Sequence, residues 1–349
     1  MKKTIDICNN FYKTKKISFE DFKYLMELDD YSELNKFARD LTIKNFGNKI
    51  YIRGLIEIST YCKNNCYYCG LRSANNNMDR MRLSKDEILK RVEKANTLGI
   101  KTVVLQGGED DFYSIDYLLD ILKEIKKNYD MAVTLSLGER SYDDLKKLRE
   151  FGANRFLLRH ETYDKDHYYK IHPESMSFRN RIDTLFELKD LGYQTGCGMM
   201  IGSPYQRLEN LYEDLELILK LKPQMVGLGP FIPHHDTPFR DFPAGKLEDV
   251  LKILSIVRIA DEKLLLPATT ALGTIDEEGR EKGILAGCNV LMPNIGDEKL
   301  RQNYKLYDNK IGTEVENSDD FFHLNEKLKK IGYEISLDRG DYKGERRNV

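Results

Sequence analysis

Residues 50–72 read IYIRGLIEISTYCKNNCYYCGLR and join two signals of different kinds. The first ten residues are mostly apolar, over a length typical of a buried β-strand. The loop that follows holds Cys62, Cys66 and Cys69, three of the six cysteines in the chain. The stretch therefore predicts a strand that leads directly into a cluster of thiols, and this clustering requires a chemical explanation.

The same alternation of a short apolar run and a helix-period segment continues along the chain. Further strands are predicted at 101–106, 131–137, 154–159, 194–202, 224–229, 264–270 and 289–293. The segments between them carry helix signals, such as the capping box of Ser84 and Glu87 with Gly99 at the helix end. Eight strand–helix units predict an α/β fold, a (β/α)8 TIM-type barrel. An open doubly wound sheet is the alternative, but it needs fewer strands and leaves two or three units unexplained.

A barrel of this class takes about 250 residues, which leaves about 100 for additions at the two ends. We therefore predict an N-terminal helical prefix over 1–46, the barrel over 47–310 and a C-terminal helical extension over 311–349. The sequence contains no linker rich in Pro, Gly or Ser that would divide the chain further.

The charge balance and hydropathy exclude several classes of protein. Lys and Arg total 55 against 57 Asp and Glu, so neither nucleic acid nor an anionic membrane is expected as a partner. No apolar run approaches the roughly 20 residues that span a bilayer. The start, MKKTIDICNNFYK, lacks the apolar core of a signal peptide. We expect a cytoplasmic protein, in which clustered cysteines are metal or redox ligands rather than a disulfide framework.

Each predicted strand ends in a polar or glycine-rich cluster. After the cysteine loop these clusters read QGGED, TLSLGER, RHET, GMMIGSP, GPFIPHHDTP, PATTALGT and MPN. Any one of them could be a turn or a helix cap. Eight together indicate a site at the C-terminal face of the barrel. His234, His235 and Asp236 have the residue types of a metal ligand set, but beside two prolines they are more simply interpreted as a loop at the barrel mouth.

The spacing C-x3-C-x2-C restricts which metal the loop can hold. A structural zinc needs four ligands, and the candidates for a fourth, His160 and Cys8, are distant in the sequence. A 4Fe–4S cluster usually takes four cysteines, so three leave one iron open to a substrate or cofactor. An open iron at a barrel mouth implies catalysis rather than storage.

The motif, with Tyr68 before its last cysteine and its place after the first strand, resembles the radical S-adenosylmethionine (SAM) superfamily. The resemblance implies that Cys62, Cys66 and Cys69 hold one 4Fe–4S cluster whose open iron binds SAM. It also implies reductive cleavage of SAM to methionine and a 5′-deoxyadenosyl radical. The implied cofactor contacts are Tyr68, Gly107, Gly108, Glu109, Ser136, Glu161, Arg181, Met200, Ile201 and Gly202. A plain strand-to-helix turn at the two glycines and a core strand at 200–202 remain alternatives.

Several strings together narrow the resemblance. VVLQGGED, TLSLGE, RFLLRHET, MVGLGPFIPHHDTP, PATTALGT and NVLMPN, between Tyr51 and Tyr307, are similar to the radical SAM maturases of FeFe-hydrogenase. This similarity implies assembly of the dithiolate-bridged di-iron cofactor from a cysteine-bound Fe(CO)2CN unit. It also implies transient contact with a partner maturase and a scaffold protein, and an electron donor such as ferredoxin or flavodoxin. The implied substrate pocket consists of Gln106, Thr134, Arg155, Arg159, Met225, Thr269, Thr270, Met292 and Tyr304.

The chain departs from part of that family at its C-terminal end. Some members carry a second cysteine cluster there, but residues 308–325 contain no cysteine, so one cluster is expected. Cys197 and Cys288 lie in apolar surroundings and are interpreted as core thiols, while Cys8 is left without a role. Arg159 as a structural ion-pair partner and each methionine as plain core remain open.

Three other functions remain open. A related radical SAM enzyme, such as the lysine mutase of pyrrolysine synthesis or a maturase for another hydrogenase, would differ at Arg159 and at Thr269 and Thr270. A non-catalytic iron–sulfur or zinc scaffold would not turn over SAM. An RNA-modifying enzyme would need a basic face, which the short segment 341–349 cannot supply.

Overall fold

The computed structural model describes residues 2–296, 303–311 and 318–344. The predicted C-terminal extension falls partly outside the described residues, at 312–317 and 345–349. In the described part of the chain, no helix has the length and apolar character needed to cross a membrane.

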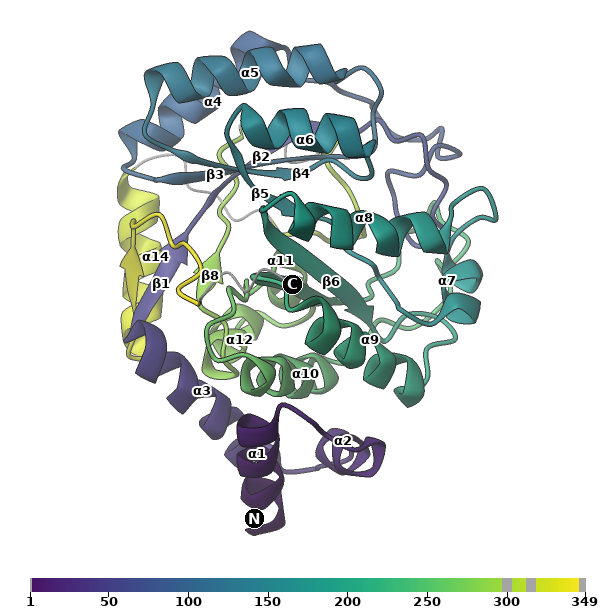
Figure 1. Ribbon diagram of the computed structural model, residues 1–349, viewed down its shortest axis with the longest axis vertical. Helices are drawn as coiled ribbons and strands as arrows, with labels where there is room; N and C mark the ends of the chain where they lie inside the picture. Colours follow the sequence, from purple (N-terminus) through teal and green to yellow (C-terminus); the bar gives the residue numbers. More distant parts are fainter. Residues whose placement is uncertain (1, 297–302, 312–317, 345–349) are drawn as a thin grey trace.

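Three helices precede the first strand. They are α1 (Lys2–Thr14), α2 (Phe19–Met26) and α3 (Ser32–Phe46). Ser18 caps α2 because its hydroxyl accepts a hydrogen bond from the Asp21 amide at 3.1 Å. Helix α3 packs along α10 (Leu247–Ala260), while α1 and α2 form the narrow end of the molecule in Figure 1.

A six-stranded parallel sheet in chain order forms the centre of the molecule, which confirms the α/β barrel class. Its strands are β2 (Gly54–Ser59), β3 (Thr102–Gly107), β4 (Ala132–Ser136), β5 (Ala153–Leu157), β6 (Gln194–Ile201) and β7 (Met225–Pro230). The helices on its outer side are α4 (Lys85–Thr97), α5 (Ile115–Asn128), α6 (Tyr142–Glu150), α7 (Lys165–Ile171), α8 (Phe178–Asp190) and α9 (Leu208–Leu221). Figure 1 shows these helices wrapped around the curved sheet.

The strands that complete the barrel are shorter than the sequence predicts. The predicted strand 50–59 is divided at Arg53 into β1 (Lys49–Ile52) and β2, and β1 belongs to a second sheet. The predicted strand 264–270 contributes only single bridges, from Leu265 to Met225 and from Pro267 to Val290. Proline lacks an amide hydrogen, so a regular ladder cannot continue through Pro267. The barrel class is thus confirmed, but between β7 and β8 the barrel is closed by single bridges of residues 264–270 rather than by a regular strand.

The second sheet brings the two ends of the chain together. Strand β1 lies between β8 (Val290–Leu291) and β9 (Glu334–Ser336), all parallel. The short helices α11 (Thr270–Ile275) and α12 (Gly279–Leu285) precede β8, and α14 (Ser318–Lys330) precedes β9. The C-terminal region, predicted as helical, therefore also supplies a strand, and Figure 1 shows α14 and β9 beside β1.

Candidate active site

The loop between β2 and α4 carries the three clustered cysteines, and one arginine organises it. The Arg80 guanidinium donates hydrogen bonds of 2.5–2.9 Å to four carbonyls of the loop, those of Thr60, Leu71, Arg72 and Asn75. Four charge-assisted hydrogen bonds from one planar fork fix the loop in a compact turn. The sequence analysis missed this role of Arg80, because the loop must fold back before its carbonyls converge.

All three cysteines line a cavity of about 320 Å³ at the carboxyl ends of the strands. Each of the six strands of the main sheet contributes to its wall. Fourteen further residues of the predicted site share this cavity: Tyr68, Gln106, Gly107, Gly108, Glu109, Ser136, Arg159, Glu161, Arg181, Met200, Thr269, Thr270, Met292 and Tyr304. The structure therefore gathers most of the predicted residues around the thiols, from positions far apart in the sequence.

Gly108 makes the close approach of two loops possible. A Cβ atom at this position would lie 2.2 Å from the Tyr61 carbonyl oxygen and 2.7 Å from Cβ of Cys62. A side chain here would push β3's loop away from the cysteine loop. Packing therefore requires a glycine at position 108 of QGGED, in addition to any requirement of the turn.

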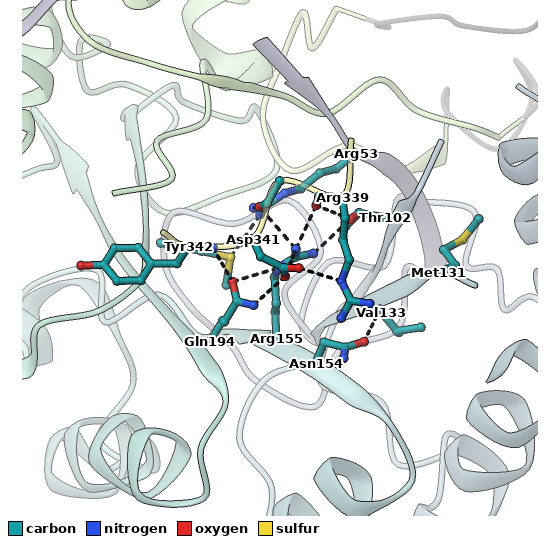
Figure 2. Close-up of polar contacts among 12 residues, drawn as sticks. Arg53, Thr102, Met131, Val133, Asn154, Arg155, Gln194, Arg339, Asp341 and Tyr342 are labelled. Carbon is teal, nitrogen blue, oxygen red and sulfur yellow. Dashed lines mark hydrogen bonds and ion pairs between the residues drawn. The ribbon is translucent and has the colours of Figure 1, made fainter. Parts of the chain in front are cut away.

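Five predicted residues do not line this cavity. Arg155 is fully buried toward the N-terminal end of the barrel, where its guanidinium lies 2.7 Å from the Asp341 carboxylate (Figure 2). Met225 lies beside it at the start of β7, with its sulfur 3.1 Å from the Arg53 guanidinium. Both side chains lie among groups from the C-terminal segment rather than among the thiols.

The other three predicted residues outside the cavity are Thr134, Ile201 and Gly202. Thr134 points into the barrel below Ser136, and among the described residues its buried hydroxyl has no hydrogen-bond partner. Ile201 packs in the hydrophobic core, and Gly202 is exposed, with a φ of 75°. Of the GMMIGSP segment, Met200 is therefore the member that faces the cavity.

The electrostatics of the three thiols favour a cation among them. Burial raises the pKa of the Cys62 and Cys66 thiols and raises that of Cys69 to about 12. For Cys66, a negative charge on either of the other two sulfurs raises the pKa further. Three half-buried thiolates side by side are unfavourable without positive charge among them, and a metal supplies that charge on binding. The donor set therefore fits a group such as an iron–sulfur cluster.

Arg181, a buried arginine of the cavity wall, joins two carboxylates, of which Glu109 also lines the cavity. Arg181 lies 3.2 Å from Glu109 and 2.6 Å from Glu139. Burial lowers the pKa of Arg181, but the two carboxylates outweigh that effect and raise it above its ordinary value. The trio carries two negative charges against one positive charge. It can therefore attract an ammonium group of a ligand, and Arg181 is not a free cation for a ligand carboxylate.

Tyr68 is oriented by a histidine that the sequence analysis did not select. The Tyr168 carbonyl accepts from Nδ1 of His172 at 3.0 Å, so Nε2 accepts the hydroxyl proton of Tyr68 at 3.2 Å. Burial lowers the pKa of His172 to about 3, which keeps the ring neutral. His172 itself lines the cavity.

A charged pair outside the predicted site, Glu57 and Lys310, also lines the cavity. Nζ of Lys310 lies 2.5 Å from the Glu57 carboxylate, which also accepts from the Asn294 amide at 2.6 Å. Lys310 also donates to the Tyr304 carbonyl at 3.0 Å and lies over the ring of that tyrosine. One signal for this site was present, since Glu57 is the single charged residue of β2.

The loop at His234, His235 and Asp236 brings potential metal ligands together, but its hydrogen bonds disfavour a metal. The Asp236 amide donates to Nδ1 of His234 at 3.1 Å, so Nε2 of that ring carries the proton. A histidine that binds metal through Nε2 needs that nitrogen unprotonated. His235 instead pairs with Asp308 at 2.7 Å, which agrees with a loop at the barrel mouth.

The other three cysteines are structural. Cys8, Cys197 and Cys288 are each fully buried, and they pack in the main hydrophobic core. Burial raises the pKa of all three thiols. The interpretation of Cys197 and Cys288 as core residues agrees with this packing.

Comparisons with known proteins identify relatives across most of the chain. The sequence model of the radical SAM superfamily matches residues 56–218. The [FeFe] hydrogenase maturase subunit HydE of Thermotoga maritima is 45% identical over 278 residues, which cover 80% of this chain and 79% of that protein. The 3-methylornithine synthase of Methanosarcina acetivorans is 30% identical, over 84% and 83% of the two chains. The crystal structure of methylornithine synthase (PylB) superimposes with a TM-score of 0.82 at 25% identity, over 95% and 97%.

Proposed function

Because the chain belongs to the radical SAM superfamily and is an enzyme of that class, we propose that it cleaves SAM at a single 4Fe–4S cluster. Membership implies an iron–sulfur cluster and SAM. The proposal adds that Cys62, Cys66 and Cys69 are the protein ligands of one cluster. The observation that carries it is the convergence of three half-buried thiols on a cavity that most of the predicted cofactor contacts also line.

The residues around the thiols suit the two ends of SAM. The cluster, when bound, supplies the electron that splits the sulfonium. The net negative trio of Glu109, Arg181 and Glu139 would hold the amino group of the methionine moiety. Ser136 and Glu161 would donate to and accept from the ribose, and Met200 would pack on the adenine.

For the substrate, we propose a small, anionic, cysteine-bound Fe(CO)2CN unit. The enzyme would act on this unit in the assembly of the di-iron cofactor of FeFe-hydrogenase. The higher identity to HydE than to 3-methylornithine synthase supports this choice. The pocket would consist of Arg159, Gln106, Thr269, Thr270, Met292 and Tyr304, which line the cavity. Thr134, Arg155 and Met225 would join it only if the substrate reached deeper into the barrel.

Such a reaction needs protein partners. We propose that a partner maturase delivers the substrate, that a scaffold protein accepts the product and that ferredoxin or flavodoxin supplies electrons. These contacts would be transient and would occur in the cytoplasm under anaerobic conditions.

The second candidate is the synthesis of 3-methylornithine. The 30% identity and the superposition on methylornithine synthase favour it. The pair of Glu57 and Lys310 in the cavity wall gives it a chemical basis, because a diamino acid such as lysine carries one carboxylate and two amines that such a pair could hold.

The first experiment is anaerobic reconstitution with iron and sulfide, followed by reduction with dithionite and addition of SAM. We expect about four irons per chain, a change in the electron paramagnetic resonance spectrum on addition of SAM, and release of 5′-deoxyadenosine. Bound zinc, or no nucleoside at any level of reductant, would reject the proposal in favour of a scaffold.

The substrate assignment has its own test in Arg159→Leu. Arg159 pairs with Glu161 at 3.1 Å, and its side chain is 37% exposed to the cavity side. We expect the variant to release 5′-deoxyadenosine without substrate but to lose product formation, whereas Arg159→Lys should keep a partial activity. Loss of nucleoside release in Arg159→Leu would move this residue to the cofactor. Product formation from lysine by the unaltered protein would favour the second candidate.

A further inference from the structure

The turn that follows β5 presents alternate residues to opposite sides. Arg159 and Glu161 line the cavity, while His160 and Thr162 point into the protein and are fully buried. Glu161 has a φ of 64°, in the left-handed region that a glutamate seldom adopts. Such a conformation costs of order 1 kcal/mol or more, and it persists only where the surroundings enforce it. The groups behind the turn therefore decide where the two cavity residues point.

His160 is held from two sides. Its Nδ1 accepts from the Gly198 amide of β6 at 3.3 Å, so its Nε2–H faces the Asp214 carboxylate at 3.2 Å. Asp214 lies on α9 and is fully buried. The same carboxylate oxygen accepts from the Tyr163 amide at 2.6 Å. One side chain of α9 thus binds the turn on both sides of Glu161.

A second brace supports the other end of the turn. His167 donates from Nε2 to the Pro204 carbonyl at 3.0 Å, so its Nδ1 accepts from the Thr162 hydroxyl at 3.0 Å. Asn210, one helical turn before Asp214 on α9, donates to Asp164 at 2.7 Å. Helix α9 therefore clamps residues 160–164 through two side chains on one face.

A purely structural role would not require these residue types. Burying a carboxylate costs several kcal/mol, and well-packed apolar side chains of similar volume often serve stability equally well. The polar pair supplies direction, because Asp214 accepts from the Tyr163 amide and His160, oriented by the Gly198 amide, faces the same carboxylate oxygen. Two backbone contacts with β6 complete this geometry: Glu161 donates to the Gly198 carbonyl at 3.0 Å and accepts from the Met200 amide at 3.3 Å.

We propose that His160 and Asp214 are positioning residues that hold Arg159 and Glu161 in the cavity through the backbone of 159–163. This inference rests on the proposed function, in which Glu161 contacts SAM. It predicts that damage to the pair weakens SAM binding without loss of the cluster, because the cysteines lie on a different loop.

The test measures binding rather than turnover. Labelled SAM is dialysed to equilibrium against the reconstituted, unreduced protein, and iron per chain is measured in parallel. Asp214→Leu and His160→Phe should each weaken binding by about 10-fold, the lower bound for lost outer partners of a site. Asp214→Asn keeps an oxygen for Tyr163 and His160 and should weaken it by less than about threefold. The double variant should be no weaker than the worse single variant, because the two residues act as one unit.

Ser255→Ala is the matched control. Ser255 is fully buried on α10 and does not line the cavity, and its hydroxyl shares its one proton between Oδ1 of Asn35 at 2.9 Å and the Ala286 carbonyl at 3.1 Å. It should lower the melting temperature and leave the SAM affinity unchanged. If Asp214→Leu and His160→Phe behave in the same way, with stability lost and affinity within twofold of the unaltered protein, the inference is wrong.

Two further outcomes are a variant that fails to fold and an unaltered protein that binds no SAM. If Asp214→Leu does not fold, His160→Gln decides: its Nε2 can still donate to Asp214, but it places no acceptor where the ring Nδ1 accepts from Gly198, so binding should weaken about threefold. Unchanged binding in His160→Gln would then overturn the inference. If the unaltered protein itself binds no SAM, the proposed function fails, and the inference fails with it.

Discussion

The two ends of the barrel use buried charge in opposite ways. At the N-terminal end, the Arg155 guanidinium donates to Asp341, Gln194 and Thr102 and to backbone carbonyls of 339–340 (Figure 2). At the C-terminal end, three thiols and the wall residues Arg159 and Glu161 face an open cavity. At the first end, every nitrogen of the Arg155 guanidinium has a partner within the protein, which marks a structural seal. At the second end, thiols and charged side chains that face a cavity mark a ligand site.

We expect the largest effect from a substitution that disrupts the site at the C-terminal end of the barrel and leaves the N-terminal end intact. Cys66→Ala should abolish cluster binding and reduce 5′-deoxyadenosine to background, because two thiolates cannot hold a 4Fe–4S cluster. Iron analysis and nucleoside chromatography measure both. Cys197→Ala, a core cysteine, should keep its iron. Retained SAM cleavage in Cys66→Ala would refute the ligand assignment.

The next largest effect is expected from a substitution that disrupts the charged cluster at the N-terminal end of the barrel and leaves the cavity intact. Asp341→Ala leaves the buried Arg155 without its carboxylate, which would cost about 3–5 kcal/mol in a fully buried pair. Asp341 is 40% exposed, so water compensates in part and we expect a loss of about 2 kcal/mol in unfolding free energy. Urea unfolding measures the loss, and iron content should not change. Arg339→Ala, which removes an exposed partner of the same carboxylate, should cost under about 1 kcal/mol. Equal losses in the two variants would show that burial of Arg155 is irrelevant.

A smaller effect appears in the pH dependence of that seal. Burial raises the pKa of Asp341, but Gln194, Arg155 and Arg339 outweigh it and lower the pKa below the ordinary 3.8. The stabilisation is therefore present above pH 3.8 and is lost as the pH falls through the lower folded value. The stability difference between the unaltered protein and Asp341→Asn should be constant from neutral pH down to about pH 5 and then shrink in acid. A difference that grows in acid would contradict the sign of the shift.

The smallest effect concerns the rim of the C-terminal end. Asp308 raises the pKa of His235 above 6.5, so any stabilisation from this pair is present below pH 6.5 and is lost as the pH rises through the raised value. His235 is 65% exposed, so His235→Ala should cost under about 1 kcal/mol at acidic pH and less at alkaline pH. Iron content should be unaffected; a loss of bound metal would show that this loop is a second metal site after all.

The sequence predicted one end of the barrel much better than the other. The thiols, Glu109, Arg159 and Glu161 follow strands in recognisable clusters, and parallel strands bring their carboxyl ends to one face. Arg155 was assigned to the pocket from a family resemblance. Its position in β5 is four residues before Arg159, the last residue of the RFLLR run, which places it deeper in the barrel. The role of Asp341 could not be predicted, since it lies 186 residues away along the chain.

The sequence by itself determined the barrel class, the cysteine loop and most of the cavity wall, because local periodicity and short motifs encode strands, helices and the residues at strand ends. Only the tertiary structure decided which charges are free to meet a ligand. It paired Lys310 with Glu57, placed Asp214 behind Glu161 and sealed Arg155 with Asp341. These pairs join segments far apart in the chain, and their energies depend on burial and distance, quantities that exist only once the chain has folded.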